Sequence, residues 1–313
     1  MSTELKLSEL YEIADNLHIV NFFKMSTEQL IKAIKNAKIK KENDSRSMNM
    51  ISLNTYNVTS YVGVYTESIS SLIYIMYKFK KYCGVVPNSF LHNKLSEMSN
   101  IKNLDWSNIM INITNSKTLT FPKGFFKQFD KCLKTSERFI FFPLNFQNKR
   151  IAHANYMLYD KNTNEMERFE PNGEYTNSEI IPEIIDESLV YVFNDRYNKN
   201  GNKFIRKYYK PLSFCPYYSF QYIQGTENKQ TKKDPSGFCA AWSTWYIELR
   251  FSNPNINRKQ LVNLSIEKLK NNNKSLTSYI RSYSVLLRYI HKNLLQDVPI
   301  KDIFKNIDKY IKH

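Results

Sequence analysis

Residues 234–251 read DPSGFCAAWSTWYIELRF, and this stretch decides more about the chain than any other. It opens with four turn-forming residues. Large apolar side chains then recur at helical spacing: Phe238, Trp242, Trp245 and Leu249. The spacing predicts a buried helix with Cys239 in its first turn. The positive end of a helix dipole lowers a thiol pKa, and Gly237 allows a substrate close approach. Cys239 is thus a candidate nucleophile, with a structural cysteine on a core helix as the alternative.

Two strands are expected upstream, in IAHANYMLYD (151–160) and NEMERFEPNG (164–173). The residues between them are turn formers, which predicts an antiparallel hairpin turning at 161–162. With that turn His153 lies directly opposite Glu170 on one face of the sheet. A carboxylate beside an imidazole fixes its tautomer and stabilises the imidazolium. The two residues are either a base with its orienting acid or an incidental surface pair.

The chain order of His153, Glu170, a glutamine and Cys239 at a helix start resembles the Ulp1-like cysteine protease superfamily. That superfamily includes the SUMO-specific proteases and the adenovirus protease. ERFEPNG and DPSGFCAAW resemble most closely the thiol proteases of giant DNA viruses such as mimivirus. The resemblance covers about residues 138–252. It implies that His153 is the general base, Glu170 the orienting acid and Cys239 the nucleophile.

A glutamine in that family supplies a hydrogen bond to the oxyanion, usually from six or seven residues before the cysteine. Two lysines stand at those positions here. The candidates are Gln221, Gln224 and Gln230, and a longer loop at 225–235 would explain the displacement. We favour Gln221, with Gln224 as a close second. Two further positions depart from the family pattern: Ala154 stands where Trp is frequent and Ala240 where Gly is frequent.

The composition of the 313-residue chain is that of a globular protein, with 42% hydrophobic and 14% aromatic residues. No apolar run approaches the roughly 20 residues of a membrane span, so no membrane partner is expected. The N-terminus shows no secretory signal. The sequence contains neither a Walker A nor a GxGxxG motif, which argues against nucleotide-phosphate cradles.

The pattern of elements predicts an α+β fold, a papain-like or Ulp1-like peptidase core with a central mixed sheet flanked by helices. Strands are expected at 138–142, 151–159, 165–170, 203–209 and 217–224. Helices are expected at 66–82, 178–194, 238–251, 258–271, 276–295 and 300–311.

Two short helices are predicted within residues 7–36, and Ser26 with Gln29 forms a capping box for the second. This pattern resembles the small SAP or Rho-N-terminal-like modules that often contact nucleic acid; a helical hairpin packed on its own domain is the alternative. Residues 37–58 are polar and aperiodic and read as a linker. The expected domains are a helical hairpin at 1–45, a linker at 46–60 and a peptidase domain at 61–313.

The net charge is +16, and residues 258–313 hold twelve basic and four acidic side chains. A basic segment of this kind attracts polyanions, so nucleic acid is an expected partner of the C-terminal segment. The lysine content is equally typical of proteins from AT-rich genomes.

The chain has four cysteines, Cys83, Cys132, Cys215 and Cys239, and none forms a CxxC motif. They are expected to be free thiols in a reducing compartment, without a metal site.

The resemblance implies a thiol protease that needs no cofactor. It would cleave peptide or isopeptide bonds after small residues, in ubiquitin-like conjugates or viral precursor proteins. The expected location is the virion or the host cytoplasm. The alternatives are an acyltransferase of the same catalytic architecture and a non-catalytic, basic nucleic-acid-binding virion protein.

Overall fold

The computed structural model describes residues 6–17, 19, 21–56, 59, 61–63, 65–85, 111–114, 118–147, 152–172, 182–198, 201–216, 219–227, 234–235, 237–272 and 275–295. The helix predicted at 300–311 lies outside these ranges, and so does Gln230.

A seven-stranded mixed sheet forms the centre, in the order β3–β2–β4–β5–β6–β7, with β1 also on β4. The strands are β1 (Cys83–Gly84), β2 (Ile111–Thr114), β3 (Thr118–Thr120), β4 (Phe139–Gln147), β5 (Ala152–Asp160), β6 (Glu165–Phe169) and β7 (Lys207–Tyr209). β4, β5 and β6 are antiparallel, β1 and β2 run parallel to β4, and β7 runs parallel to β6. The prediction of a central mixed sheet is confirmed.

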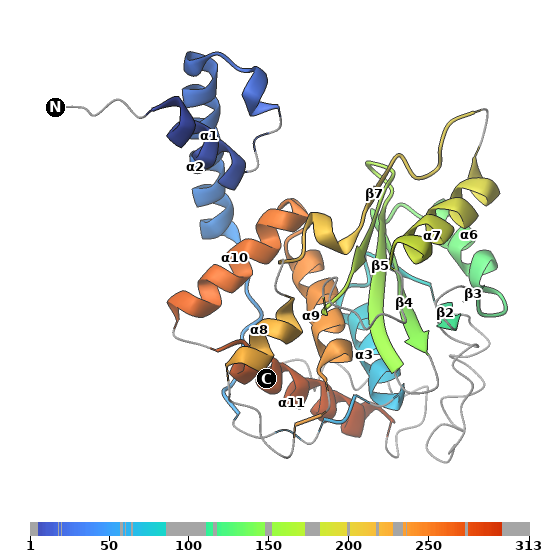
Figure 1. Ribbon diagram of the computed structural model, residues 1–313. Coiled ribbons are helices and arrows are strands. Elements are labelled where there is room, and N and C mark those ends of the chain that lie inside the picture. The colour runs from blue at the N-terminus through green and yellow to red at the C-terminus, as the bar shows by residue number, and fades with distance from the viewer. Residues whose placement is uncertain are drawn as a thin grey trace.

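Helices cover both faces of the sheet (Figure 1). The helices are α1 (Leu7–Asn16), α2 (Thr27–Ser47), α3 (Tyr65–Lys78), α6 (Phe125–Lys134), α7 (Pro182–Tyr197), α8 (Phe220–Thr226), α9 (Cys239–Ser252), α10 (Arg258–Asn271) and α11 (Leu276–Leu295), with 3₁₀ turns at Phe22–Lys24 and Pro211–Ser213. The alternation of β4 divides the core in two. Phe139 and Phe141 pack in the cluster with α3, α9 and α11, whereas Ile140 and Phe142 pack in the cluster with α6 and α7.

The helix α9 is buried over nearly its whole length, as its apolar pattern predicts. Its Glu248 is fully buried, and three neighbours satisfy the carboxylate. Tyr74 (3.1 Å) and Lys78 (2.5 Å) come from α3, and Tyr283 (2.6 Å) comes from α11. These bonds fix α9 between two helices, and so fix the position of Cys239 at its first residue.

The β5–β6 hairpin differs from the prediction in its register. Asp160 pairs with Glu165, so four residues form the loop instead of two, and Asn164 takes the left-handed conformation (φ 53°). Continuing this register brings Glu170 opposite Asn155 rather than His153. The predicted pairing is therefore wrong by two residues. A shift of two keeps every side chain on its face, so His153 and Glu170 still share one.

The N-terminal hairpin of α1 and α2 has its own small core of Leu10, Ala14, Leu30 and Ile34. The predicted capping box is present, with Gln29 N donating to Ser26 Oγ and Ser26 N to Gln29 Oε1. The prediction of a linker from residue 37 is wrong, because α2 continues to Ser47. Its polar residues lie on an exposed helix, a pattern that composition alone does not separate from a linker.

Two other predictions are corrected. The strand expected at 203–209 is confined to Lys207–Tyr209, and the strand expected at 217–224 is the helix α8. The short apolar run SFQYIQ allows either conformation, since periodicity cannot separate a short strand from one helical turn. Ser219 caps the helix by accepting the N–H of Tyr222 (3.0 Å).

The thiols also differ from expectation, because Cys83 and Cys132 form a disulfide between β1 and α6. Only Cys215 and Cys239 are free. Disulfides are typical of oxidising compartments, so the cysteine count no longer supports a reducing location.

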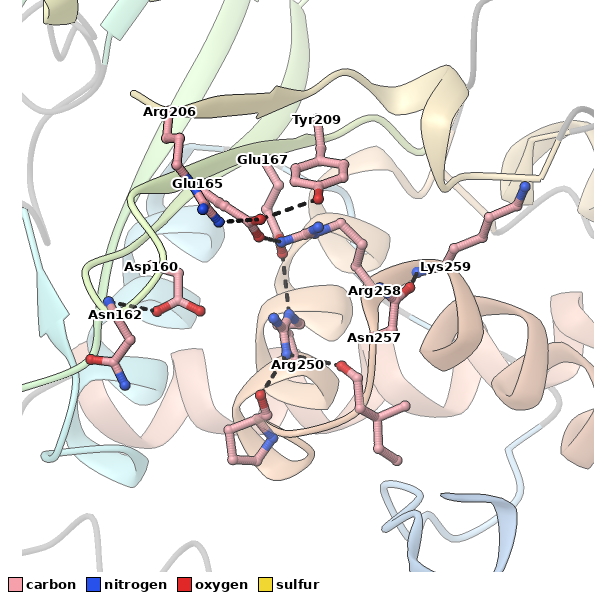
Figure 2. A network of polar contacts seen from close by, with 12 residues as sticks. Asp160, Asn162, Glu165, Glu167, Arg206, Tyr209, Arg250, Asn257, Arg258 and Lys259 are labelled. Carbon is pink, nitrogen blue, oxygen red and sulfur yellow. Dashed lines mark hydrogen bonds and ion pairs between the residues drawn. The ribbon is translucent and has the colours of Figure 1, made fainter. Parts of the chain in front are cut away.

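A buried ion network ties the sheet to α9 and α10 (Figure 2). Glu167 on β6 accepts from Tyr246 (2.7 Å), Arg250 (3.3 Å) and Arg258 (2.5 Å). Arg258 also donates to Glu165 (2.7 Å) and lies over the ring of Tyr209, 3.5 Å from its centroid. Burial raises the pKa of Glu167, but the two guanidinium groups outweigh it and hold the pKa below its ordinary value.

None of the helices in the described ranges has both the length and the apolar character of a bilayer span.

Candidate active site

Cys239 is the first residue of α9, where the backbone N–H groups have no partner within the helix. The preceding turn is close-packed. A Cβ at Gly237 would lie 2.8 Å from the end of the Gln221 side chain, so a larger residue there would displace that amide. The Ser243 hydroxyl, one turn into the helix, donates to the carbonyl of Ala154 on β5 (2.9 Å). The helix start is thereby held against the beginning of β5, where His153 lies.

His153 and Glu170 form a buried ion pair between His153 Nε2 and Glu170 Oε1. The side chain of His153 is 6% exposed and that of Glu170 is 3% exposed, so water screens the pair little. The remaining oxygen of Glu170 accepts from Asn155 Nδ2 (3.0 Å), and the backbone N–H of Asn172 donates to Oε1 (2.8 Å). The carboxylate is held on all sides, and it holds the imidazole in turn.

Behind Glu170 lies a second layer that the sequence did not reveal. Arg168 donates to Asn155 Oδ1 (2.9 Å) and lies 3.6 Å from Glu170 Oε2. It also forms a two-pronged pair with Asp186 of α7, at 2.6 and 3.1 Å. Strand alternation places Arg168 on the same face as Glu170. This two-residue spacing is the sequence feature that could have indicated Arg168. The local sequence does not indicate that Asp186 is its partner.

The three groups shift one another's pKa in the directions that favour an ion pair. Burial lowers the pKa of His153, but the negative charges of Glu170 and Cys239 outweigh it and raise the pKa to about 10. Burial raises the pKa of Cys239, yet the charge and hydrogen bond of His153 bring it below the ordinary thiol value. Glu170 is likewise held below its ordinary pKa, against the effect of burial. The arrangement therefore favours a thiolate beside an imidazolium.

Of the two favoured glutamines, Gln221 is the one beside Cys239. With its amide oriented so that donors meet acceptors, Oε1 accepts from the N–H groups of Phe238 and Cys239 (both 3.1 Å), and Nε2 donates to Asn172 Oδ1. Gln224 is buried elsewhere and accepts from Trp242 Nε1 (3.2 Å). The expected neighbour is thus found, although on a helix and not on a strand. Asn172 links Gln221 to Glu170, with its side-chain oxygen accepting from Gln221 and its backbone N–H donating to Glu170.

The other free thiol, Cys215, has no imidazole partner among the described residues. Burial raises its pKa to about 12. Within the described part of the chain, no cluster of three or more His, Cys, Asp or Glu side chains could hold a metal ion.

Replacing Glu170 with glutamine should slow turnover without removing it. The amide keeps the shape but loses the charge that raises the pKa of His153, so the thiolate–imidazolium state is less populated. We expect kcat to fall by roughly 10²-fold or more. The exposed Glu187 of α7 offers the matched control, and Glu187→Gln should turn over like the wild type. Equal rates for Glu170→Gln and the wild type would remove Glu170 from the site.

The basic C-terminal segment is partly used inside the fold. Arg258 and Arg281 are each 5% exposed and form ion pairs, the second with Asp234 (2.7 Å). Lys268 donates to the carbonyl of Met48 (3.0 Å). Nucleic-acid binding by residues 258–313 stays a prediction. Arg258, Arg281 and Lys268 contribute less to it than free surface cations would, because each is already engaged within the protein.

No protein-family model matches the chain. A curated relative from Acanthamoeba polyphaga mimivirus, named "Putative ankyrin repeat protein L371", is 24% identical over 290 residues, which is 86% of this chain and 36% of that protein. The chain thus spans about a third of the length of this relative. The expected likeness to a mimivirus protein is found, but its name describes ankyrin repeats and not a thiol protease.

Two solved structures show partial likeness. ChlaDUB, an effector protein of Chlamydia abortus, has a TM-score of 0.30 and 13% identity, over 71% of this chain and 99% of that one. Residues 1–487 of RavZ, an effector protein of Legionella pneumophila, give a TM-score of 0.38 and 12% identity, over 81% and 70% of the two chains. Neither TM-score is high enough to assign a function to this chain.

Proposed function

We propose that this protein is a cysteine hydrolase that cleaves peptide or isopeptide bonds through Cys239. The observation that carries the proposal is the chain formed by the buried Glu170 and His153 with the half-buried Cys239 at the start of α9. A thiolate at a helix N-terminus beside a carboxylate-held imidazolium is the arrangement that activates a cysteine for acyl transfer.

The proposed reaction has two halves. The Cys239 thiolate attacks the carbonyl carbon, and the carbonyl electron pair moves onto oxygen. When this intermediate collapses, the C–N bond breaks and the His153 imidazolium gives its proton to the leaving amine. Water then attacks the thioester, His153 takes the water proton, and the released sulfur returns to thiolate.

The oxyanion is held in this proposal by the backbone N–H of Cys239 and the side-chain amide of Gln221. In the amide orientation that satisfies its hydrogen bonds, Gln221 Oε1 accepts from that N–H. The substrate oxygen must therefore replace Oε1, and a half-turn of the amide directs Nε2–H toward the oxyanion. For this rotation Gln221 must give up its hydrogen bond to Asn172.

The substrates proposed are proteins, either ubiquitin-like conjugates or viral precursor proteins with small residues before the cleaved bond. This finer proposal is supported by the resemblance of ERFEPNG and DPSGFCAAW. Ubiquitin and SUMO probes with a C-terminal vinyl trap test it, with mass spectrometry locating the adduct. An adduct on Cys239 supports the proposal, whereas transfer of labelled acetyl from acetyl-CoA to protein, without cleavage, identifies an acyltransferase instead.

The pH dependence should follow the two shifted groups. Because the pKa of Cys239 lies below the ordinary thiol value of 9.0, iodoacetamide should label it at pH values where a free thiol reacts slowly. Turnover should fall as the pH passes about 10, because His153 then no longer carries the proton for the leaving amine. Cys215, with a pKa of about 12, is the internal control and should stay unlabelled. A labelling midpoint for Cys239 at the ordinary thiol value would contradict the ion pair.

A further inference from the structure

The hydroxyl of Tyr61 is the buried polar group near Cys239 that the proposed mechanism leaves unused. Tyr61 is 1% exposed, and its hydroxyl has no hydrogen-bond partner among the described residues. A buried polar group without a partner destabilises the folded state, so one that persists calls for an explanation. Tyr61 precedes α3 and adjoins the stretch that the sequence predicted to be a linker.

The backbone around Tyr61 is held from two sides. The N–H of Tyr61 donates to Thr59 Oγ1 (3.0 Å), which also accepts from Ser284 of α11 (2.9 Å). Glu67 of α3 accepts from the N–H groups of Val62 (3.1 Å) and Gly63 (2.8 Å). These bonds fix the backbone on both sides of Tyr61 and so position its ring. The Tyr61 hydroxyl takes part in none of them.

The same turn reaches the residues before Cys239. A Cβ built at Gly63 would lie 3.6 Å from Cε1 of Tyr61 and 4.0 Å from the carbonyl oxygen of Gly237, two residues before the cysteine. Burial, together with the negative charges of Glu67 and Cys239, raises the pKa of Tyr61 well above its ordinary value. The hydroxyl thus stays protonated, close enough to feel the charge of the thiolate. A neutral phenol in that place keeps an O–H that can donate a hydrogen bond to an acceptor that arrives.

Gln221 strengthens the case for a second donor. Its Oε1 already takes up the N–H of Cys239 and its Nε2 faces Asn172. An incoming carbonyl oxygen therefore competes with Gln221 for the one backbone donor at the cysteine. A hydroxyl that has no other partner has nothing to give up when it binds that oxygen.

We propose that the Tyr61 hydroxyl donates a hydrogen bond to the carbonyl oxygen of the acyl group that Cys239 attacks, and to the oxyanion formed from it. The inference rests on the proposed function, since it assigns a further catalytic residue to the same site. The bond strengthens as negative charge gathers on that oxygen, so it stabilises the transition state more than the bound substrate.

The test compares two reactions of one thiolate in wild type and Tyr61→Phe. Acyl transfer from p-nitrophenyl acetate passes through an oxyanion, whereas alkylation by iodoacetamide displaces iodide from carbon and forms none. We expect Tyr61→Phe to slow acylation by roughly 10²-fold and to leave alkylation unchanged. Tyr159→Phe is the matched control, because that buried phenol bonds to Asn164 (3.0 Å) on the α6–α7 face of the sheet. It should acylate as the wild type does.

Each outcome decides the matter. Because the lost hydroxyl has no partner, Tyr61→Phe should unfold at the wild-type temperature or above it; a lowered unfolding temperature shows a structural role and overturns the proposal. Equal slowing of acylation and alkylation places the effect on the thiolate and also overturns it, as does unchanged acylation. If wild type acylates no faster than Cys239→Ala, the proposed function itself fails, and the role of Tyr61 with it.

Discussion

Replacing Cys239 with alanine should abolish turnover while the protein stays folded. The thiolate is the group that forms the covalent intermediate, and no other described side chain can take its place at the start of α9. We expect kcat to fall by on the order of 10⁴-fold or more. The loss of one sulfur from a helix start should cost only about 1–3 kcal/mol. Turnover of the purified variant and its thermal unfolding measure the two effects separately.

Cys215→Ala is the matched control for this substitution. It removes the second free thiol, which is buried and has no imidazole beside it among the described residues. The control should keep wild-type turnover. If Cys239→Ala turned over normally, or failed to fold where Cys215→Ala folds, Cys239 would be a structural residue.

The largest effect on stability is expected from Arg258→Ala. This substitution leaves the fully buried Glu167 short of one partner and removes the cation above the ring of Tyr209. Breaking a buried pair in this way costs about 3–5 kcal/mol, because a charge is left uncompensated. Chemical denaturation should show the free energy of unfolding falling by that amount. At low pH the difference in unfolding free energy between Arg258→Ala and the wild type should become smaller, because Glu167 is then protonated in both proteins.

Arg206→Ala supplies the comparison, because Arg206 contacts the same network from outside (Figure 2). Its side chain is 69% exposed and lies 3.7 Å from Glu165. Solvent screens such a pair, so its removal should cost at most about 1 kcal/mol. Similar losses for the two variants would mean that burial does not strengthen this network.

The geometry also sets the order of effects around the candidate site. Glu170 acts on Cys239 through His153, so its replacement should cost less than that of Cys239. Tyr61 contributes one hydrogen bond in our proposal, and its removal should leave the thiolate intact. Acylation and alkylation rates of the three variants therefore distinguish three roles. Cys239→Ala tests the nucleophile, Glu170→Gln tests the orientation of His153, and Tyr61→Phe tests stabilisation of the oxyanion.

Much of the local structure follows from the sequence itself. The spacing from Phe238 to Leu249 predicts a buried helix with Cys239 in its first turn, and Cys239 begins α9. The alternation of β5 and β6 predicts that His153 and Glu170 share a face, and they do although the register moved by two. Both properties repeat over two to four residues, so near neighbours in the chain determine them.

Tertiary packing decided what lies farther apart along the chain. It made α8 a helix, brought Gln221 rather than Gln224 to Cys239, and joined Cys83 to Cys132. It also brought the turn that holds Tyr61 close to Gly237, two residues before the candidate nucleophile. It also chose Asp186 as the partner of Arg168. None of these contacts produces a periodic pattern in the sequence. Each depends on how helices pack on the sheet, between residues that are tens or hundreds of positions apart. Local pattern therefore determined which residues could act, and packing determined which of them meet.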